Sequence, residues 1–267
     1  MTDILHYAFV QKALIAGILS GVLLAVIGVY VVLKKMSFIG DGIAHSAFGG
    51  VALGLLLGFN TSAAAVIFAW VIAMLIGISK KNSKTSEDAL IGIFFAFTMA
   101  LGVIFIGLNK TYNADIFGYL FGDILAVTDA DLWTIGIVCV VALSTVYVFF
   151  KELLYFAFDE EGAKVSGINT NFIYFLLLTL ITFTIVASIK IIGIILAVAF
   201  LIVPASTALL MTHNFKKVMG LAVIISVIST VSGFIFSYVF NVASGAAIVV
   251  VATLIFGSVT AVTRFKK

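Results

Sequence analysis

The chain contains 267 residues, of which 63% are hydrophobic and 10% are charged, and its formal net charge is +3. Its mean hydropathy is +1.30. This composition excludes a soluble globular protein and predicts an integral membrane protein. The single proline and the long apolar runs favour transmembrane helices over a barrel of alternating strands.

In chain order, the apolar stretches predict about nine membrane spans, because each is close to the roughly 20 residues that a crossing helix needs. They cover residues 13–33, 38–59, 62–79, 89–108, 132–150, 171–189, 191–212, 218–240 and 244–263. The stretches 171–189 and 191–212 meet at Lys190 with almost no loop, so eight spans is the alternative. Residues 110–128 are predicted as a surface helix or a re-entrant segment. The predicted fold class is therefore an all-α polytopic membrane bundle.

Basic residues concentrate on the cytoplasmic side of a membrane. If the first span ends inside at Lys34 and Lys35, most other basic residues also fall inside. These are Lys80, Lys81, Lys84, Lys151, Lys164, Lys216, Lys217, Arg264, Lys266 and Lys267. The charged residues predicted on the outer side are Lys12, Lys110, Lys190, Asp115, Asp123, Asp129 and Asp131. This alternation places the C-terminus in the cytoplasm.

No loop is long enough to fold as a soluble domain. Residues 1–267 are therefore expected to form a single transmembrane domain. Any module that supplies energy or binds a ligand outside the membrane is expected on another chain.

The second span contains MSFIGDGIAHSAFGGVALG, from Met36 to Gly54, which carries Asp41 and His45. Residues four apart share one face of a helix. Counted from Lys35, His45 would lie roughly 15 Å deep at 1.5 Å per residue, where an ionisable group is costly unless it has a partner or a function. A carboxylate and an imidazole can bind zinc, manganese or iron. The structural alternative is that the two side chains hydrogen-bond each other or a neighbouring helix.

Two ligands are too few for a tight metal site. If two copies of the chain met at a two-fold axis, their pairs would supply four ligands, the usual number for a closed zinc site.

An adjacent ridge of the same helix carries a small residue at every fourth position. These residues are Gly42, Ser46, Gly50, Gly54 and Gly58. Such a small-residue ladder allows another backbone to approach closely. We expect this ridge to pack against a neighbouring helix while the adjacent face presents Asp41 and His45.

Between the fifth and sixth spans, the loop FAFDEEGAKVSGINTNF begins its polar part with Asp159, Glu160 and Glu161. The order Glu161-Gly162-Ala163 followed by Gly167 resembles the E-A-A-x-x-x-G loop with which ABC importer permeases dock on their ATPase. Acidic residues in a first turn and a glycine at the end predict a short helix. The alternative is an ordinary solvated loop helix.

With both motifs considered, the chain resembles the permease subunits of the ABC importer family that transports zinc, manganese or iron. The likeness covers nearly the whole chain. It rests on LKKMSFIGDGIAHSAFGGVALG, on SEDALIGIFFAFTMALGVIF from Ser86, on YLFGDILAVTDADL from Tyr119, on FDEEGAKVSGIN from Phe158 and on IIGIILAVAFLIVPASTALL from Ile191. In many relatives a proline stands at the position of Gly49.

This resemblance implies a type II importer-like permease in the cytoplasmic (inner) membrane of a prokaryote. It implies a homodimer that works with two copies of an ABC ATPase and receives metal from an extracytoplasmic metal-binding protein. It assigns the metal pathway to Asp41 and His45, and the coupling loop, about residues 156–169, to Asp159 through Gly167. It also implies that the chain has no catalytic activity, holds no permanent cofactor and binds no nucleic acid, and that the partner subunit uses the ATP.

Two other hypotheses remain open from the sequence. A proton-coupled secondary carrier would use Asp41 and His45 as a proton relay and would need no ATPase. An ABC permease for a metal chelate would need a wider cavity lined by aromatic side chains. Pro204 is expected to kink or break its span.

Overall fold

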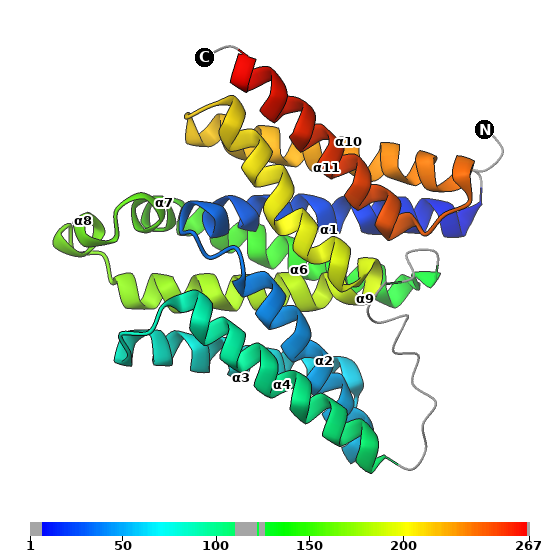
Figure 1. Cartoon of the computed structure of the whole chain (residues 1–267), viewed down its shortest axis with the longest axis horizontal. Coiled ribbons are helices and arrows are strands. Elements are labelled where there is room, and N and C mark those ends of the chain that lie inside the picture. The colour runs from blue at the N-terminus through cyan, green and yellow to red at the C-terminus, as the bar shows by residue number, and fades with distance from the viewer. Residues whose placement is uncertain (1–6, 110–121, 123–125, 266–267) are drawn as a thin grey trace. The chain divides into compact units, whose positions relative to one another are not determined.

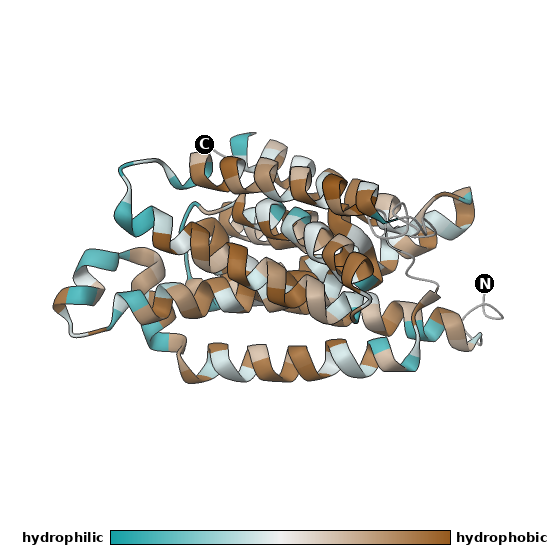
Figure 2. Ribbon diagram, turned by 90° about the horizontal axis from the view of Figure 1, so that it is seen from below, coloured by the Kyte–Doolittle hydropathy of each residue, from teal (hydrophilic) through white to brown (hydrophobic). Residues whose placement is uncertain are grey.

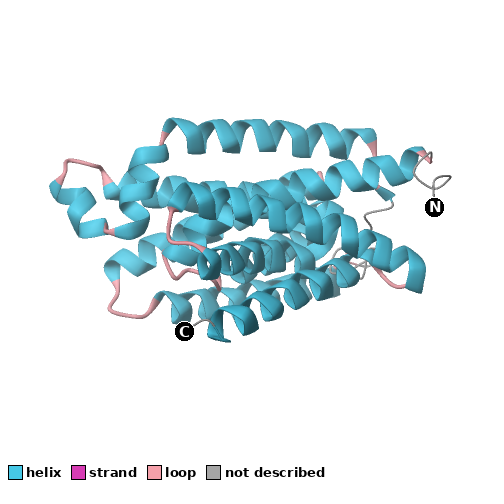
Figure 3. Cartoon of the chain, turned by 90° about the horizontal axis from the view of Figure 1, so that it is seen from above, coloured by secondary structure: helices cyan, strands magenta, loops and turns pink. Residues whose placement is uncertain are grey.

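The computed structural model describes residues 7–109, 122 and 126–265. In these residues the chain forms α-helices and no strands (Figure 1, Figure 3). The helices are α1 (Ala8–Leu33), α2 (Ile39–Leu57), α3 (Thr61–Asn82), α4 (Glu87–Leu108), α6 (Asp129–Val148), α7 (Phe150–Phe158), α8 (Glu160–Val165), α9 (Thr170–Met211), α10 (Phe215–Phe240) and α11 (Ser244–Phe265). Most of the 110–128 segment, with Lys110, Asp115 and Asp123, lies outside the described residues.

Eight helices of the described part are long and apolar enough to cross a membrane. Figure 2 shows hydrophobic residues along the long helices and hydrophilic residues mainly at their ends and in the connections. The helices α7 and α8 have 9 and 6 residues, which is too short for a crossing. The prediction of an all-α polytopic membrane protein is confirmed.

The helix α9 has 42 residues, about twice the length that one crossing needs. Its backbone leaves the helical conformation at Gly193, with φ 79° and ψ 167°. The segments 170–192 and 194–211 on either side correspond to the two spans predicted to meet at Lys190. Counted as one helix, α9 brings the described total to the eight spans of the alternative prediction.

Pro204 does not mark this break. It lies inside the helical part of α9, whereas the non-helical residue is Gly193. The span is therefore not broken at Pro204, and a kink at this residue stays a prediction. Glycine reaches this backbone conformation at no steric cost, which explains why the chain changes direction at Gly193.

The helices cluster into two groups. Unit 1 comprises Met1–Val32, Phe117–Ser144 and Ala187–Lys267, and unit 2 comprises Leu33–Ile116 and Thr145–Val186. In unit 1, α10 packs against α11. The two helices are so close that a Cβ added to Gly233 of α10 would lie 2.5 Å from the Cα of Ile248 in α11. In the same unit Gly28 of α1 leaves no room for a Cβ beside the carbonyl of Leu201 in α9.

Two ion pairs in unit 1 join residues that were predicted on the outer side. Lys12 Nζ lies 2.7 Å from Asp129 Oδ1, and Lys190 Nζ lies 2.6 Å from Asp131 Oδ1. Lysines are less frequent on that side of a membrane than on the cytoplasmic side. These two are each paired with an acidic residue at the start of α6, which the sequence pattern did not reveal.

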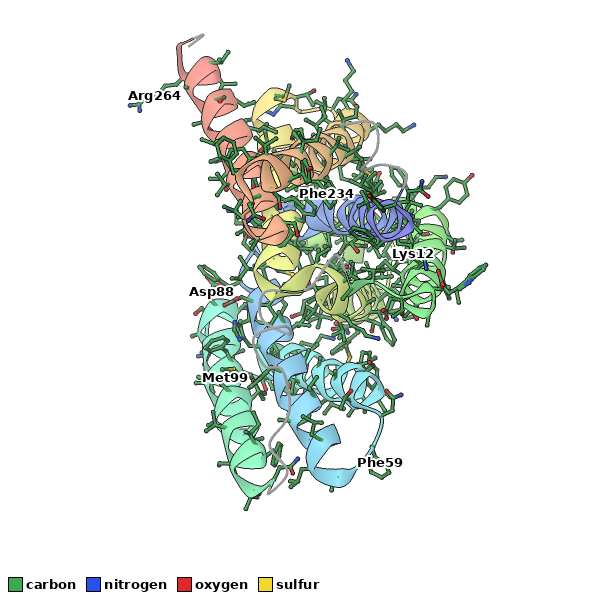
Figure 4. All side chains as sticks on the ribbon, turned by 90° about the vertical axis from the view of Figure 1, so that its right-hand side faces the viewer. Lys12, Phe59, Asp88, Met99, Phe234 and Arg264 are labelled. Atoms are coloured by element: carbon green, nitrogen blue, oxygen red, sulfur yellow. The ribbon has the colours of Figure 1, made fainter. Side chains whose placement is uncertain are left out.

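In unit 2, α2 packs against both α3 and α4, and Figure 1 shows the three helices side by side. Figure 4 shows Asp88 at one end of α4, Met99 farther along it, and Phe59 in the connection between α2 and α3. The first segment of α9 also contacts α3, where Trp70 Nε1 donates a hydrogen bond to Thr179 Oγ1 at 3.2 Å. This three-helix group positions the candidate site.

Side-chain caps fix where several helices start. Asn60, Ser86 and Asn214 each accept a hydrogen bond from the backbone N–H three residues later, at the starts of α3, α4 and α10. Such a cap satisfies one of the unpaired donors of the first turn. The predicted spans that begin at 62, 89 and 218 therefore start one to three residues earlier in the structure.

Candidate functional site

The Asp41–His45 pair lies near the start of α2, after a turn formed by residues 34–38. Lys35 has a φ of 58°, in the left-handed region that ends a helix. The helix α2 begins only at Ile39. His45 is therefore about 9 Å along the helix axis from the start of α2. The expected depth of roughly 15 Å assumed a continuous helix from Lys35, which the structure does not have.

The two side chains approach each other on one face of α2. His45 Nε2 lies 3.5 Å from Asp41 Oδ1, beyond the usual 2.7–3.2 Å range of a hydrogen bond. Two metal bonds of about 2.1 Å at a tetrahedral angle place their ligand atoms about 3.4 Å apart. The separation thus suits a shared metal ion better than the direct hydrogen bond of the structural alternative.

The surroundings of the pair leave it partly open. The side chain of Asp41 is 45% exposed and that of His45 is 19% exposed. The His45 ring meets Phe95 of α4 edge-on, with ring centroids 4.7 Å apart. Its Nδ1 is buried and has no hydrogen-bond partner in the described part of the chain. Packing against Phe95, rather than a hydrogen bond, therefore orients the imidazole.

Within the described residues, no group of three or more His, Cys, Asp or Glu side chains could hold a metal ion. Within the described part of one chain, the Asp41–His45 pair is therefore an incomplete coordination shell. Ligands from a second copy of the chain stay a prediction.

The small-residue ladder of α2 contacts two helices. At its start, a Cβ on Gly42 would lie 2.7 Å from Ile91 Cγ2 of α4, and Ser46 Oγ lies 3.3 Å from Thr98 Oγ1 of α4. Farther along, a Cβ on Gly50 would lie 2.7 Å from Ala65 Cα of α3. Each step of four residues turns the ridge by about 40°, which carries it from α4 toward α3.

The ladder ends one member earlier than expected, at Gly54 rather than at Gly58. Gly54 still packs tightly, since a Cβ there would lie 2.9 Å from Ala64 Cβ. Gly58 instead follows the last residue of α2 with a φ of 69°, and a Cβ on it would meet nothing within 4 Å. A glycine is needed at position 58 for the left-handed conformation that ends α2. The prediction that Gly58 packs against a neighbouring helix is therefore wrong.

Gly49, one residue before Gly50 of the ladder, also packs closely. A Cβ on it would lie 3.0 Å from the backbone oxygen of Thr98. Small residues on two neighbouring ridges therefore bring α4 to this part of α2.

The loop predicted to couple to an ATPase contains the short helix α8. Asp159 Oδ1 accepts a hydrogen bond from Gly162 N at 2.9 Å. The Asp159 carboxylate occupies the space that a Cβ on Gly162 would need. At the other end, Ile168 N donates to the Ala163 oxygen, and Gly167 has a φ of 84°. Asp159, Gly162 and Gly167 thus explain the start and the end of α8.

The residues of α8 face different ways. Glu161, Lys164 and Val165 are exposed, and Val165 is 90% exposed. Ala163 has no exposed surface. It packs into this chain, and its assignment to the coupling loop stays a prediction. Glu160 also differs from Glu161, because its Oε2 accepts a hydrogen bond from Lys34 Nζ at 2.7 Å.

Comparisons with known proteins agree with this architecture. Residues 6–263 match the ABC 3 transport family. A solved structure, PsaBC from Streptococcus pneumoniae in complex with Fab, superposes with a TM-score of 0.86 at 38% sequence identity, covering 97% of this chain and 93% of the other.

Two relatives have names that state a transported metal. The manganese transport system membrane protein MntC of Listeria monocytogenes is 40% identical over 96% of this chain and 91% of its own length. The high-affinity zinc uptake system membrane protein ZnuB of Haemophilus influenzae is 36% identical over 91% of this chain and 94% of its own length.

Proposed function

Because the chain belongs to the ABC 3 transport family, we propose that it is the membrane-spanning permease subunit of an ABC importer for a divalent transition-metal ion. The observation that carries the proposal is the Asp41–His45 pair, whose facing atoms lie 3.5 Å apart on a helix apolar enough to span the membrane. The manganese and zinc systems after which its relatives are named make these two ions the first candidates.

Asp41 and His45 supply one oxygen and one nitrogen ligand per chain. Two copies around a two-fold axis supply four, which is a sufficient shell for a first-row ion. Asp41 and His45 hold the ion together, and the more exposed Asp41 lies one helical turn nearer the predicted cytoplasmic end of α2. We therefore propose that the transport unit contains two copies of the chain, with residues 1–267 of each acting as one transmembrane domain.

The pair is suited to transient rather than permanent binding. At resident metal sites, the N–H of the second histidine ring nitrogen donates a hydrogen bond to a partner that fixes the orientation of the ring. His45 Nδ1 has no such partner among the described residues. Weak holding favours transport, because an ion that binds too tightly is not released.

The exposed side of α8 supplies a docking surface for the ATPase on the cytoplasmic side. Glu161, Lys164 and Val165 are available there, while Ala163 and Glu160 are engaged within the chain. The ATPase hydrolyses ATP, an extracytoplasmic binding protein delivers the ion, and the permease itself performs no chemistry. Its place is the inner membrane of a bacterium.

The proposal is tested by reconstituting the permease with its candidate ATPase and binding protein in liposomes and following manganese and zinc uptake with and without ATP. ATP-dependent uptake is expected for one of the ions. It should be lost in the Asp41→Ala/His45→Ala variant. The matched control is Asp88→Ala/His213→Ala, which removes the same two side-chain types at exposed positions outside the site and should retain uptake.

The outcomes separate the remaining hypotheses. Uptake driven by a proton gradient without the ATPase would establish a secondary carrier. Uptake of a metal chelate but not of the free ion delivered by the binding protein would establish the chelate permease. Unchanged ATP-dependent uptake in the Asp41/His45 variant would remove the pair from the pathway.

A further inference from the structure

The turn between α1 and α2 is attached to the coupling helix by one lysine. Lys34 Nζ lies 2.7 Å from Glu160 Oε2 in α8 and 3.9 Å from the ring centroid of Phe156 in α7. The Lys34 side chain is only 16% exposed. An ion pair combined with a cation–π contact on a largely buried amine fixes the position of Lys34 more firmly than a solvated surface pair would.

This attachment leads directly to the metal-site helix. Lys34 is followed by Lys35 with its positive φ of 58° and by Met36, which is 1% exposed. The backbone N–H of Ile39 then donates to the Met36 oxygen at 3.0 Å, and α2 begins. Only this short, anchored turn separates Lys34 from Asp41 in the first turn of α2. A displacement of Glu160 therefore reaches Asp41 through a few residues.

The region around α7 and α8 is also connected to α4, through Tyr174 of α9. Phe156 packs near Tyr174 of α9, with ring centroids 6.2 Å apart, and the Tyr174 hydroxyl donates to Glu87 Oε1 at 2.9 Å. Glu87 is the first residue of α4, the helix whose Phe95 contacts His45. Figure 1 shows α7, α8, the start of α9 and the α3–α4 connection together at one end of unit 2. Both helices that form the site are thus tied to the coupling region.

We infer that Lys34 is a positioning residue that links movement of α8 to the Asp41–His45 pair, an inference that rests on the proposed function. Glu160 moves with α8 when the ATPase rearranges, Lys34 follows Glu160, and the start of α2 follows Lys34. The Tyr174–Glu87 bond holds α4 against the same region. Lys34 acts through Glu160 and the start of α2, and its effect is on the coupling between the ATPase and the ion.

The test measures metal uptake and ATP hydrolysis in the same proteoliposomes. Lys34→Met and Glu160→Gln should each lower the number of ions moved per ATP hydrolysed by about tenfold. The double variant should have the same ratio as either single variant, because each single substitution already breaks the Lys34–Glu160 ion pair. Lys35→Met is the matched control: it removes a neighbouring exposed charge that forms no salt bridge with the described residues, and it should leave the ratio unchanged.

Exchanging the charges of Lys34 and Glu160 distinguishes a loss of coupling from a loss of the folded structure. Lys34→Glu should lower the ratio further than Lys34→Met, since it faces Glu160, and adding Glu160→Lys should recover part of the loss. An unchanged ratio in Lys34→Met, multiplied losses in the double variant, or no recovery in the exchange would each overturn the inference. A wild-type complex that hydrolyses ATP but moves no metal would overturn the proposed function, and this inference with it.

Discussion

Glycines in this chain serve two physical purposes, and the two kinds should respond differently to the same substitution. Gly167 and Gly193 have φ values of 84° and 79°, which other residues adopt only with strain. Gly50 and Gly54 lie inside α2 without such φ values, and what they require is space, since a Cβ on either would lie closer than 3.0 Å to α3. The sequence alone shows only that all four are glycines.

At Gly167, the backbone strain caused by a substitution can be measured without any steric clash of the new side chain. A Cβ there would meet nothing within 4 Å, so a substitution perturbs the backbone alone. Gly167→Ala should destabilise the end of α8 by about 1–2 kcal/mol and weaken binding of the ATPase about fivefold or more. Gly167→Asn should lose less, because asparagine tolerates the left-handed region. Binding of the purified ATPase to the permease in nanodiscs measures both, and equal affinities would contradict the explanation.

Gly193 should be less tolerant. Its φ of 79° with ψ of 167° falls in a region that is essentially restricted to glycine. The backbone of Gly122 also lies against it, too close for a Cβ on Gly122. Gly193→Ala is expected to cost about 1–3 kcal/mol and to lower the Tm in detergent. Gly136→Ala in α6, where a Cβ meets nothing within 4 Å, is the control and should not lower it.

Among whole elements, the contact of α2 with α3 gives the clearest test. A Cβ on Gly50 would lie 2.7 Å from Ala65 Cα and 2.8 Å from the Ala64 oxygen. Both are backbone atoms, which cannot move without shifting α3. Gly50→Ala should therefore destabilise the protein by about 1–3 kcal/mol. Gly92→Ala in α4, with open space around it, should stabilise it by up to about 1 kcal/mol through helix propensity.

Thermal unfolding in detergent measures both variants, and the predicted shifts in Tm have opposite signs. A fall in Tm for Gly92→Ala as large as that for Gly50→Ala would mean that helix packing is not the cause.

The elements themselves could largely be predicted, because hydropathy over about 20 residues reports directly on membrane crossing. The small-residue ridge of α2 followed from helical spacing in the same way. Breaks in the backbone could not: the turn before Ile39 and the break at Gly193 depend on single φ values. Pairing between distant residues was equally hidden. Lys34 and Glu160 are 126 positions apart, and no local pattern in one sequence indicates their contact.

For the whole molecule, the decisive property is that the described part of one chain offers two metal ligands and no third. If the ion is held by two chains, both copies must carry an intact pair. If each chain transports alone, a damaged copy leaves its neighbour unaffected. The two cases differ in how activity falls when wild-type and Asp41→Ala/His45→Ala chains are expressed together.

With equal amounts of both chains and random pairing, about a quarter of the dimers contain two intact copies. Uptake should then fall to about a quarter of the wild-type rate if both pairs are required, and to about half if each chain acts alone. Differently tagged chains allow the mixed dimers to be purified and reconstituted separately. These should take up no metal, whereas half-maximal uptake by purified mixed dimers would show that one Asp41–His45 pair is enough. The Asp88→Ala/His213→Ala chain in place of the damaged one should leave uptake at the wild-type rate, since both substitutions lie outside the pair.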